Sequence, residues 1–257
     1  MSLARIWAIA ANGFREVIRD RILYFIGFFA LILLFALKLL PNISLGTHEK
    51  IFLDLGLGIM GILGAIVAIF VGTGLINKEI EKRTVLVLIP KPISRTEFII
   101  GKHLGLCAVL AVMLTVMSGI FLLLLYGSKI NYSPGLLLLS QLYLLLELAL
   151  LTAVAIAFGV FTSSILATLL SLGIYLMGHL STDLLKLGQI SKNTNLEALT
   201  RNLYLILPDL ERLNLRNEVA YGIWPNGSLL LSDALYAILY TAILLGIAII
   251  IFSRRQF

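Results

Sequence analysis

Long runs of apolar residues, separated by short polar stretches, are the dominant pattern along the chain. A helix that crosses a hydrocarbon layer of about 30 Å needs roughly 20 mostly apolar residues, because lipid offers no partner to an unpaired backbone group. Six segments come near that length and predict six transmembrane helices: 22–40, 55–76, 104–126, 136–161, 165–185 and 234–252. The pattern therefore predicts an all-α integral membrane protein with a single transmembrane domain over residues 1–257.

The fifth run is the least clear of the six. Its strictly apolar part, 165–180, is short, and only Thr162, Ser163 and Ser164 separate it from the fourth run. We interpret this polar break as a tight helical hairpin.

Positive charges indicate the orientation of these spans, because cytoplasmic loops are enriched in Lys and Arg. With the N-terminus in the cytoplasm, twelve Lys or Arg fall in the inner segments 1–21, 77–103, 162–164 and 253–257. The short outer segments contribute only Lys38, Lys50 and Lys129, and the other five lie in the long outer stretch 181–233. We therefore expect a multi-pass plasma-membrane protein, such as one of a bacterial inner membrane, with both termini in the cytoplasm.

Residues 1–21 have the pattern of an amphipathic helix that lies at the membrane surface. Apolar residues such as Trp7 and Phe14 recur at helical spacing opposite Arg5 and Arg15, which suits the cytoplasmic headgroup level. The alternative is a solvated extension of the first span, which would leave Trp7 and Phe14 exposed. No small-x-small cleavage site follows the first span, so we expect no signal peptide.

The outer segment 181–233 is long enough to contain helices of its own. Leucine and isoleucine repeat near a period of 3.6 from Leu196 to Leu207, after a candidate cap at Asn195. Pro208 is expected to end that helix, and 210–221 is expected to form a second. We predict that this segment lies on, or dips into, the outer leaflet.

Composition supports a membrane protein and excludes several other classes. The chain is 60% hydrophobic and 13% charged, and its 20 Lys and Arg flank the apolar runs rather than forming one nucleic-acid-binding patch. The single cysteine, Cys107, excludes an intrachain disulfide and is expected to be a packing residue. The three histidines are far apart in sequence, and no metalloprotease, hydrolase or Walker A motif occurs. We expect no catalytic residue, metal site or cofactor in this chain, and no nucleic-acid partner.

A dinucleotide-binding pattern, formed by Gly56, Gly58 and Gly61, lies in the wrong context. That fingerprint requires a strand before it and a helix after it, whereas here it opens an apolar run. Together with Gly64 and Gly72, these glycines are expected to let a neighbouring helix approach closely.

The polar segment 77–103 has an organised pattern of its own. Its first part continues the second span as a charged helix, and Pro90 and Pro92 then force an extended break. Ser94 with Glu97 forms a candidate capping box for a helix that leads into the third span. A solvated basic loop is the simplest interpretation, but the apolar stretch 84–89 favours contact with a partner surface or the membrane.

Short motifs in this segment resemble a known family. They are Glu79-x-Glu81-Lys82-Arg83-Thr84, then Lys91-Pro92-Ile93-Ser94-Arg95, then Gly101-Lys102, and the basic stretches 14–21 and 251–257 are also similar. The chain resembles the membrane subunits of ABC exporters of the second type, which share the type V exporter fold. Leu207-Pro208-Asp209-Leu210, with Asn214, resembles the branch that includes permeases of copper-enzyme maturation and gliding motility.

The resemblance implies a six-helix permease that pairs with a second permease, as a homodimer or heterodimer, in membrane lipid. Two separate ATPase subunits, which would bind ATP and Mg, are implied beneath it, with room for an accessory protein outside. It also implies that residues of the 77–103 segment couple the permease to ATPase closure, although some could only fix the loop geometry. The implied coupling residues are Glu79, Glu81, Lys82, Arg83, Thr84, Pro92, Ser94, Arg95, Gly101 and Lys102.

Glu147 is the unusual residue inside the predicted spans, with Gln141 about two turns before it. A carboxylate at this depth costs on the order of a few kcal/mol and normally faces protein. One hypothesis gives Glu147 a pathway or proton-linked role. The other gives it a hydrogen bond to another helix or to a second subunit.

Two functions from different classes fit these patterns. The first is an ATP-driven transport subunit, most consistent with an exporter, that is not an enzyme by itself. The second is a membrane scaffold or anchor that holds a cytoplasmic partner without transport. A passive channel or secondary transporter fits less well, because Glu147 is the one evident carboxylate deep inside a span and no inverted repeat is apparent.

Overall fold

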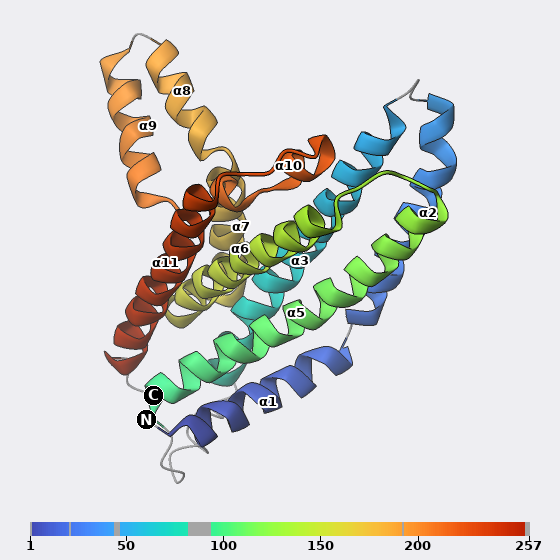
Figure 1. Ribbon diagram of the computed structural model, residues 1–257. Coiled ribbons are helices and arrows are strands. Elements are labelled where there is room, and N and C mark those ends of the chain that lie inside the picture. The colour runs from blue at the N-terminus through green and yellow to red at the C-terminus, as the bar shows by residue number, and fades with distance from the viewer. Residues whose placement is uncertain (1, 21, 44–46, 82–93, 192, 255–257) are drawn as a thin grey trace.

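The computed structural model describes residues 2–20, 22–43, 47–81, 94–191 and 193–254, and all its regular structure within those ranges is helical. Figure 1 shows a helical bundle with both termini at one end and a helical hairpin projecting from the other. The elements are α1 (Leu3–Asp20), α2 (Ile22–Ile43), α3 (His48–Glu81), α5 (Arg95–Gly127), α6 (Pro134–Phe161), α7 (Ser164–His179), α8 (Ser181–Ile190), α9 (Thr194–Ile206), η1 (Glu211–Leu213), α10 (Arg216–Tyr221) and α11 (Gly227–Arg254).

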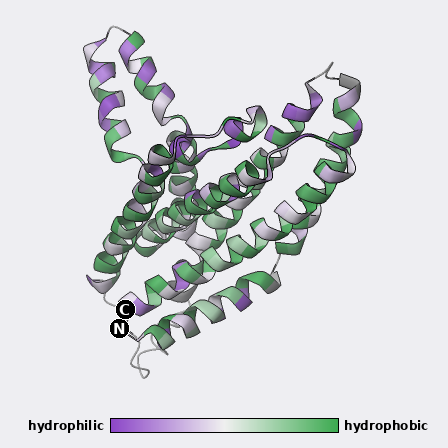
Figure 2. Cartoon of the chain, viewed as in Figure 1, coloured by the Kyte–Doolittle hydropathy of each residue, from purple (hydrophilic) through white to green (hydrophobic). Residues whose placement is uncertain are grey.

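Five described helices, α2, α3, α5, α6 and α11, are long and apolar enough to cross a membrane. They coincide with five of the six predicted apolar runs, and Figure 2 shows that apolar residues dominate them along most of their length. The sixth predicted span, 165–185, is not one straight helix. It is divided into α7 and α8, which meet at a bend of 62°.

The structure agrees with the prediction at the beginning of the 165–185 region but differs from it near the end. The hairpin expected at Thr162–Ser164 is present, because α6 ends at Phe161 and α7 begins at Ser164. The break at Leu180 was not predicted, since the apolar pattern continues through it. At the break, the Gly178 carbonyl oxygen accepts hydrogen bonds from the Leu210 backbone N–H at 3.1 Å and from Ser181 Oγ at 3.0 Å, in place of the next helical N–H.

Helix α6 is the centre of the bundle. It packs against α3, α5, α7 and α11, and also against η1 and α10. Glycines on α3 permit this close packing, as predicted: a Cβ on Gly72 would lie 2.9 Å from the Ala155 Cβ, and one on Gly64 would overlap the Leu148 side chain. A Cβ on Gly56 would likewise overlap the Phe121 ring of α5.

Helix α1 lies along the first half of α5 and is a separate helix from α2 (Figure 1). Its buried residues, Ile6, Ala10 and Val17, form a stripe that faces α5. Trp7 is 75% exposed, so the face that holds it does not pack on this chain. The amphipathic helix is confirmed, and its position at the headgroup level stays a prediction.

The segment 181–233 contains the α8–α9 hairpin, followed by η1 and α10. The predicted cap at Asn195 was wrong, because the side chain of Asn193 caps α9 by accepting a hydrogen bond from the Asn195 backbone N–H. The apolar repeat begins only at Leu196, which placed the predicted start two residues late. Helix α9 ends at Ile206, just before Pro208 as predicted, while 210–221 forms two short helices instead of one.

Candidate functional site

Four of the ten predicted coupling residues lie where the structure describes their side chains. Ser94, Arg95, Gly101 and Lys102 are at the beginning of α5. Glu79 and Glu81 belong to the last turn of α3, with their side chains outside the described part, and Lys82, Arg83, Thr84 and Pro92 lie outside the described residues. The described part of the predicted coupling site is therefore the beginning of α5.

Ser94 caps α5 through the predicted capping box. Its hydroxyl accepts a hydrogen bond from the Glu97 backbone N–H at 3.1 Å, and Glu97 Oε2 accepts one from the Ser94 backbone N–H at 3.0 Å. Glu97 Oε1 also accepts a bond of 2.7 Å from the backbone N–H of Ser2, at the beginning of α1. Because Glu97 is only 2% exposed, one buried carboxylate ties the first turns of two helices together.

Arg95 links the beginning of α5 to the end of α11. Its Nη1 donates to the Phe252 carbonyl oxygen at 2.9 Å and also to the Ser253 carbonyl. These carbonyls are in the last described turn of α11, and backbone carbonyls near the end of a helix are commonly bound by side chains. The Phe98 and Phe252 rings stack beside this contact, with centroids 5.7 Å apart.

Gly101 and Lys102 place α1 against α5. A Cβ on Gly101 would lie 2.8 Å from the Ile9 Cβ, so only glycine permits this approach. The Lys102 Nζ is 3.8 Å from Glu16 Oε2 on α1 and lies over the Phe98 ring. We call the beginning of α5, with the parts of α1 and α11 bound to it, the α1–α5–α11 joint. A displacement of the chain just before Ser94 would pass into all three helices.

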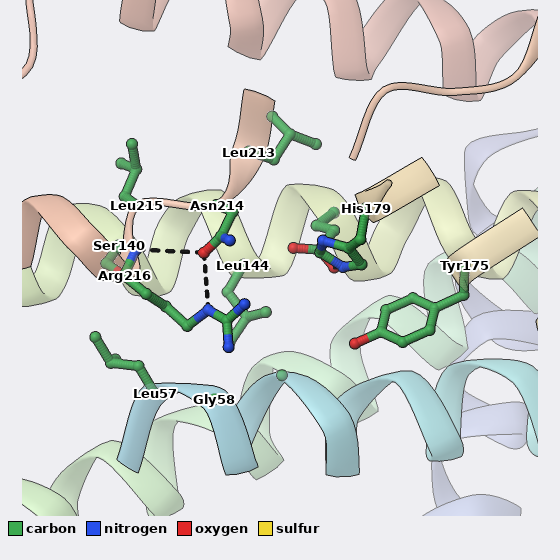
Figure 3. Close-up of a pocket in the computed structure, with 12 residues that line it drawn as sticks. Leu57, Gly58, Ser140, Leu144, Tyr175, His179, Leu213, Asn214, Leu215 and Arg216 are labelled. Carbon is green, nitrogen blue, oxygen red and sulfur yellow. Dashed lines mark hydrogen bonds and ion pairs between the residues drawn. The ribbon is translucent and has the colours of Figure 1, made fainter. Parts of the chain in front are cut away.

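A second polar group lies at the opposite end of the bundle, centred on His179. Glu147 Oε1 is 3.0 Å from His179 Nε2, and His179 Nδ1 is 3.4 Å from Glu211 Oε2. Asn214 Nδ2 donates to Glu211 Oε2 at 3.1 Å, and Arg216 Nε donates to Asn214 Oδ1 at 2.9 Å. This His179 cluster connects α6 and α7 to η1 and α10. Figure 3 shows His179, Asn214 and Arg216, with the hydrogen bonds between Asn214 and Arg216.

The surroundings of Glu211 favour the ionised form of its carboxyl group. Burial alone would raise the pKa of Glu211, but hydrogen bonds from His179 and Asn214 outweigh it and lower that pKa. A protonated imidazole donates from both ring nitrogens, which matches the two carboxylates that His179 faces. Glu147 is 3% exposed, so its carboxyl group has protein partners in place of water.

The His179 cluster borders two spaces. A small, partly open cavity of about 30 Å³ lies between Leu57, Gly58, Ser140 and Tyr175, and is large enough for one water molecule. A larger and more open pocket of about 360 Å³ begins at the same cluster and is also lined by Asp54 and Asn217. Gly58 allows this arrangement, since a Cβ there would lie 3.0 Å from the Arg216 guanidinium.

Gln141 does not belong to the His179 cluster. Its Nε2 lies 3.3 Å from the Met60 sulfur on α3. Six helical steps of about 100° place Gln141 and Glu147 on different faces of α6, whereas Ser140, seven residues before Glu147, shares its face and lines the cavity. The structure therefore separates the two residues that the sequence had grouped.

Sequence reasoning missed four members of the cluster: His179, Glu211, Asn214 and Arg216. The one available signal was the free-energy cost of placing the Glu147 carboxyl group inside the membrane, because such a group needs a polar partner within reach. Glu147 has that partner in His179 on a neighbouring helix, as the interhelical hypothesis expected. A pathway role for Glu147 stays a prediction.

Asp209, in the Leu207–Leu210 motif, is the centre of a further polar network. Its carboxylate accepts hydrogen bonds from Ser181 Oγ at 2.8 Å, Arg212 Nε at 2.9 Å and Tyr204 Oη at 3.3 Å. Its backbone N–H donates to Tyr236 Oη at 2.9 Å. The motif thus fixes α8, α9 and η1 to α11, a role that the sequence alone did not indicate.

The chemistry available in these clusters is charge pairing and proton exchange. Among the described residues, no group of three His, Cys, Asp or Glu side chains is arranged to hold a metal ion. Cys107 is packed beside His103 and Thr152, with its Sγ 3.6 Å from His103 Nε2. These contacts are consistent with the packing role predicted for Cys107.

Comparison with known proteins places this geometry in context. A family profile described as ABC-2 family transporter protein matches residues 7–257. No curated relative matches closely enough to add a more specific comparison. Because the match covers almost the whole chain, including the joint and the His179 cluster, the chain belongs to the ABC-2 transporter family and is a multi-pass membrane permease of an ABC transporter.

Proposed function

We propose that this chain is the permease subunit of an exporter that is driven by separate ATPase subunits, and that the segment 77–103 receives the motion of the ATPase. Family membership supports the ATPase partner. The observation that supports the coupling mechanism is the α1–α5–α11 joint, in which the last residues of that segment, 94–102, bind two other helices. The permease itself contributes no catalytic group, and ATP and Mg belong to the ATPase.

In this mechanism, nucleotide binding draws the ATPase subunits together and displaces the segment 77–103. At Gly101, α5 and α1 are in direct contact, and Arg95 forms hydrogen bonds to the end of α11. The three helices therefore move together at this end of the bundle. A second permease, either a copy of this chain or a relative, supplies the other wall of the transport path.

At the far end, the His179 cluster would respond to that motion. It joins α6 and α7 to η1 and α10, which pack over α3 and α6. A shift of α6 relative to η1 changes the distances on both sides of the His179 ring. We propose that this cluster is the gate at the outer end of the path, with Glu147 exposed to the path when the gate opens.

The coupling proposal is tested with the purified complex of permease and ATPase in vesicles. The variant Glu79→Ala with Arg83→Ala, and separately Arg95→Ala, should assemble normally but weaken transport and permease-dependent stimulation of ATP hydrolysis. Arg15→Ala, a change to an exposed arginine on α1, is the matched control and should behave as wild type. Wild-type coupling in both test variants would refute the assignment.

The same preparation distinguishes a transporter from a scaffold. A scaffold would bind its cytoplasmic partner without nucleotide-dependent changes in the permease. For the gate, Glu147→Gln and Glu147→Leu are compared in the transport assay. Normal transport by both variants would exclude a path or proton-linked role for Glu147.

A further inference from the structure

Helix α7 is held to α3 by a hydrogen bond between two threonine hydroxyls. Thr73 Oγ1 on α3 lies 3.0 Å from Thr168 Oγ1 on α7. Each hydroxyl also lies 2.9 Å from the backbone carbonyl oxygen four residues earlier in its own helix. These local contacts orient both hydroxyl groups. Among the side chains that the structure describes, no other hydrogen bond joins α3 to α7.

The Thr73–Thr168 bond lies one helical turn from the segment 77–103. Asn77 begins that segment, and its Nδ2 donates to the Thr73 carbonyl oxygen at 3.1 Å. Asn77 is 4% exposed and Thr73 is 1% exposed, so both side chains are enclosed by protein. Helix α3 continues without a break through these two residues to Glu81. A displacement of residues 77–81 therefore reaches Thr73 along one helix.

Helix α7 connects Thr168 to the His179 cluster. The helix is unbroken over its 16 residues from Ser164 to His179. At about 100° per residue, the steps from Thr168 to His179 make three turns and about 20°, so the two side chains lie on the same face of α7. Tyr175 shares that face, and its ring centroid lies 4.8 Å from that of His179. A shift or rotation of α7 at Thr168 therefore moves His179 as well.

Apolar packing holds α7 only weakly to the bundle. Its buried residues are all small, namely Ala167, Ser171 and Gly178. Large apolar side chains of α7, such as Leu169, are exposed instead. Lipid surrounds such side chains as favourably as a neighbouring helix does, so hydrophobic burial does not fix the position of α7. The bond between the two threonines is therefore a main directional contact between α7 and α3.

The α1–α5–α11 joint and the His179 cluster lie at opposite ends of the bundle, so the motion of the ATPase must cross it. We propose that Thr168 is a positioning residue, whose bond to Thr73 makes α7 follow α3 when the segment 77–103 moves. Because Glu147 lies on a separate helix, α6, the motion of α7 then displaces His179 relative to Glu147. This inference rests on the proposed function, since it assigns a residue and a helix to the transmission of that motion.

The test uses the complex of the full permease with its ATPase in phospholipid vesicles. Thr168→Val removes the hydroxyl but keeps a branched side chain of similar size, whereas Thr168→Ser keeps the hydroxyl. Thr73→Val removes the same bond from the other helix. Ser171→Ala is the matched control, because this buried hydroxyl donates to the Ala167 carbonyl oxygen of its own helix.

Nitroxide labels report the two ends of the bundle. Cys107→Ala removes the single cysteine and gives the parent chain. Asn217→Cys then places a label on α10 at the pocket beside the His179 cluster. In a separate sample, Arg15→Cys places a label on an exposed position of α1. The readout is the change in the electron paramagnetic resonance spectrum of each label when a non-hydrolysable ATP analogue and Mg are added.

The expected result is a severalfold smaller nucleotide-dependent change at position 217 in Thr168→Val and in Thr73→Val than in the parent chain. The change at position 15 should be retained, because the joint itself is intact. Thr168→Ser and Ser171→Ala should respond like the parent chain at both positions, which a general loss of packing would not allow.

A full response at position 217 in both valine variants overturns the inference and leaves the proposed function intact. Loss of the response in Thr168→Ser, or at both labelled positions in the valine variants, means that the substitutions disturb packing rather than one hydroxyl contact, and also overturns the inference. If the parent chain itself shows no nucleotide response at position 217, the proposed gate is wrong, and the inference fails with it.

Discussion

The contact between Gly105 and α1 offers a precise test of how the joint is built. A Cβ on Gly105 would lie 2.7 Å from the carbonyl oxygen of Ala10 and 3.2 Å from its Cα. These are backbone atoms, so no change of rotamer can relieve the overlap. Moving from 2.7 Å to the 3.4 Å at which ordinary van der Waals contact begins requires α1 to shift by about 0.7 Å.

A shift of that size has a calculable cost. A radial gap of about 0.5–1 Å forfeits a quarter to a half of each dispersion contact along the interface, and overpacking costs typically about 1–3 kcal/mol. Gly119→Ala, on the same helix, is the matched control because nothing lies within 4 Å of the added Cβ. It should gain only the helix preference of alanine, at most about 1 kcal/mol.

The readout is hydrogen exchange of the α1 backbone followed by mass spectrometry. A loss of about 2 kcal/mol in α1 docking accelerates exchange through local opening by roughly 30-fold, since each 1.4 kcal/mol is tenfold. Gly105→Ala should show this acceleration in α1 and Gly119→Ala should not. Equal α1 exchange in the two variants would refute the view that the joint depends on this close approach.

Three further changes test the clusters at the other end. His179→Ala leaves the buried Glu147 carboxylate without its partner and should destabilise the protein by about 3 kcal/mol, seen as a lower Tm in detergent; an unchanged Tm contradicts the pairing. Asp209→Ala removes three hydrogen bonds and should cost about 3 kcal/mol, whereas Asp183→Ala, in an exposed pair with Lys186, should change stability by less than about 0.5 kcal/mol. The pKa of Glu211 is lower in the folded protein than in the unfolded chain, so its contribution to stability is complete above the unfolded pKa near 4.3 and is lost as the pH falls below that value. The Tm difference between wild type and Glu211→Gln should therefore shrink as the pH is lowered over that range. A Tm difference that stays constant argues against the ionised pairing.

Most of the bundle could be predicted because hydrocarbon imposes a length and a composition on each span. The helices extend beyond the predicted runs where polar residues continue the turn, as at His48 on α3 and Arg95 on α5. The Ser94 capping box was predictable because its two hydrogen bonds are local in sequence. The break at Leu180 was not, since the hydrogen bond made there joins Gly178 to Leu210, a residue from a distant part of the chain.

The polar clusters could be predicted only in part, because each joins residues from distant segments. Glu147 was recognisable by its position alone, but its partner His179 looked like one of three scattered histidines. Glu97 was predicted as a cap, while its bond to Ser2 spans 95 positions. Arg95 was selected by family resemblance, and only the folded chain shows that it holds the end of α11.

The central position of α6 has a consequence for how this protein is made. It is the most buried of the candidate spans, yet it is synthesised only after α2, α3 and α5 have left the ribosome. The side of α3 that holds Gly64 and Gly72 must therefore stay uncovered in the bilayer until the fourth hydrophobic segment arrives. Ribosome pausing or chaperone occupancy at residues 134–161 would then govern the yield of assembled protein more strongly than at any earlier span.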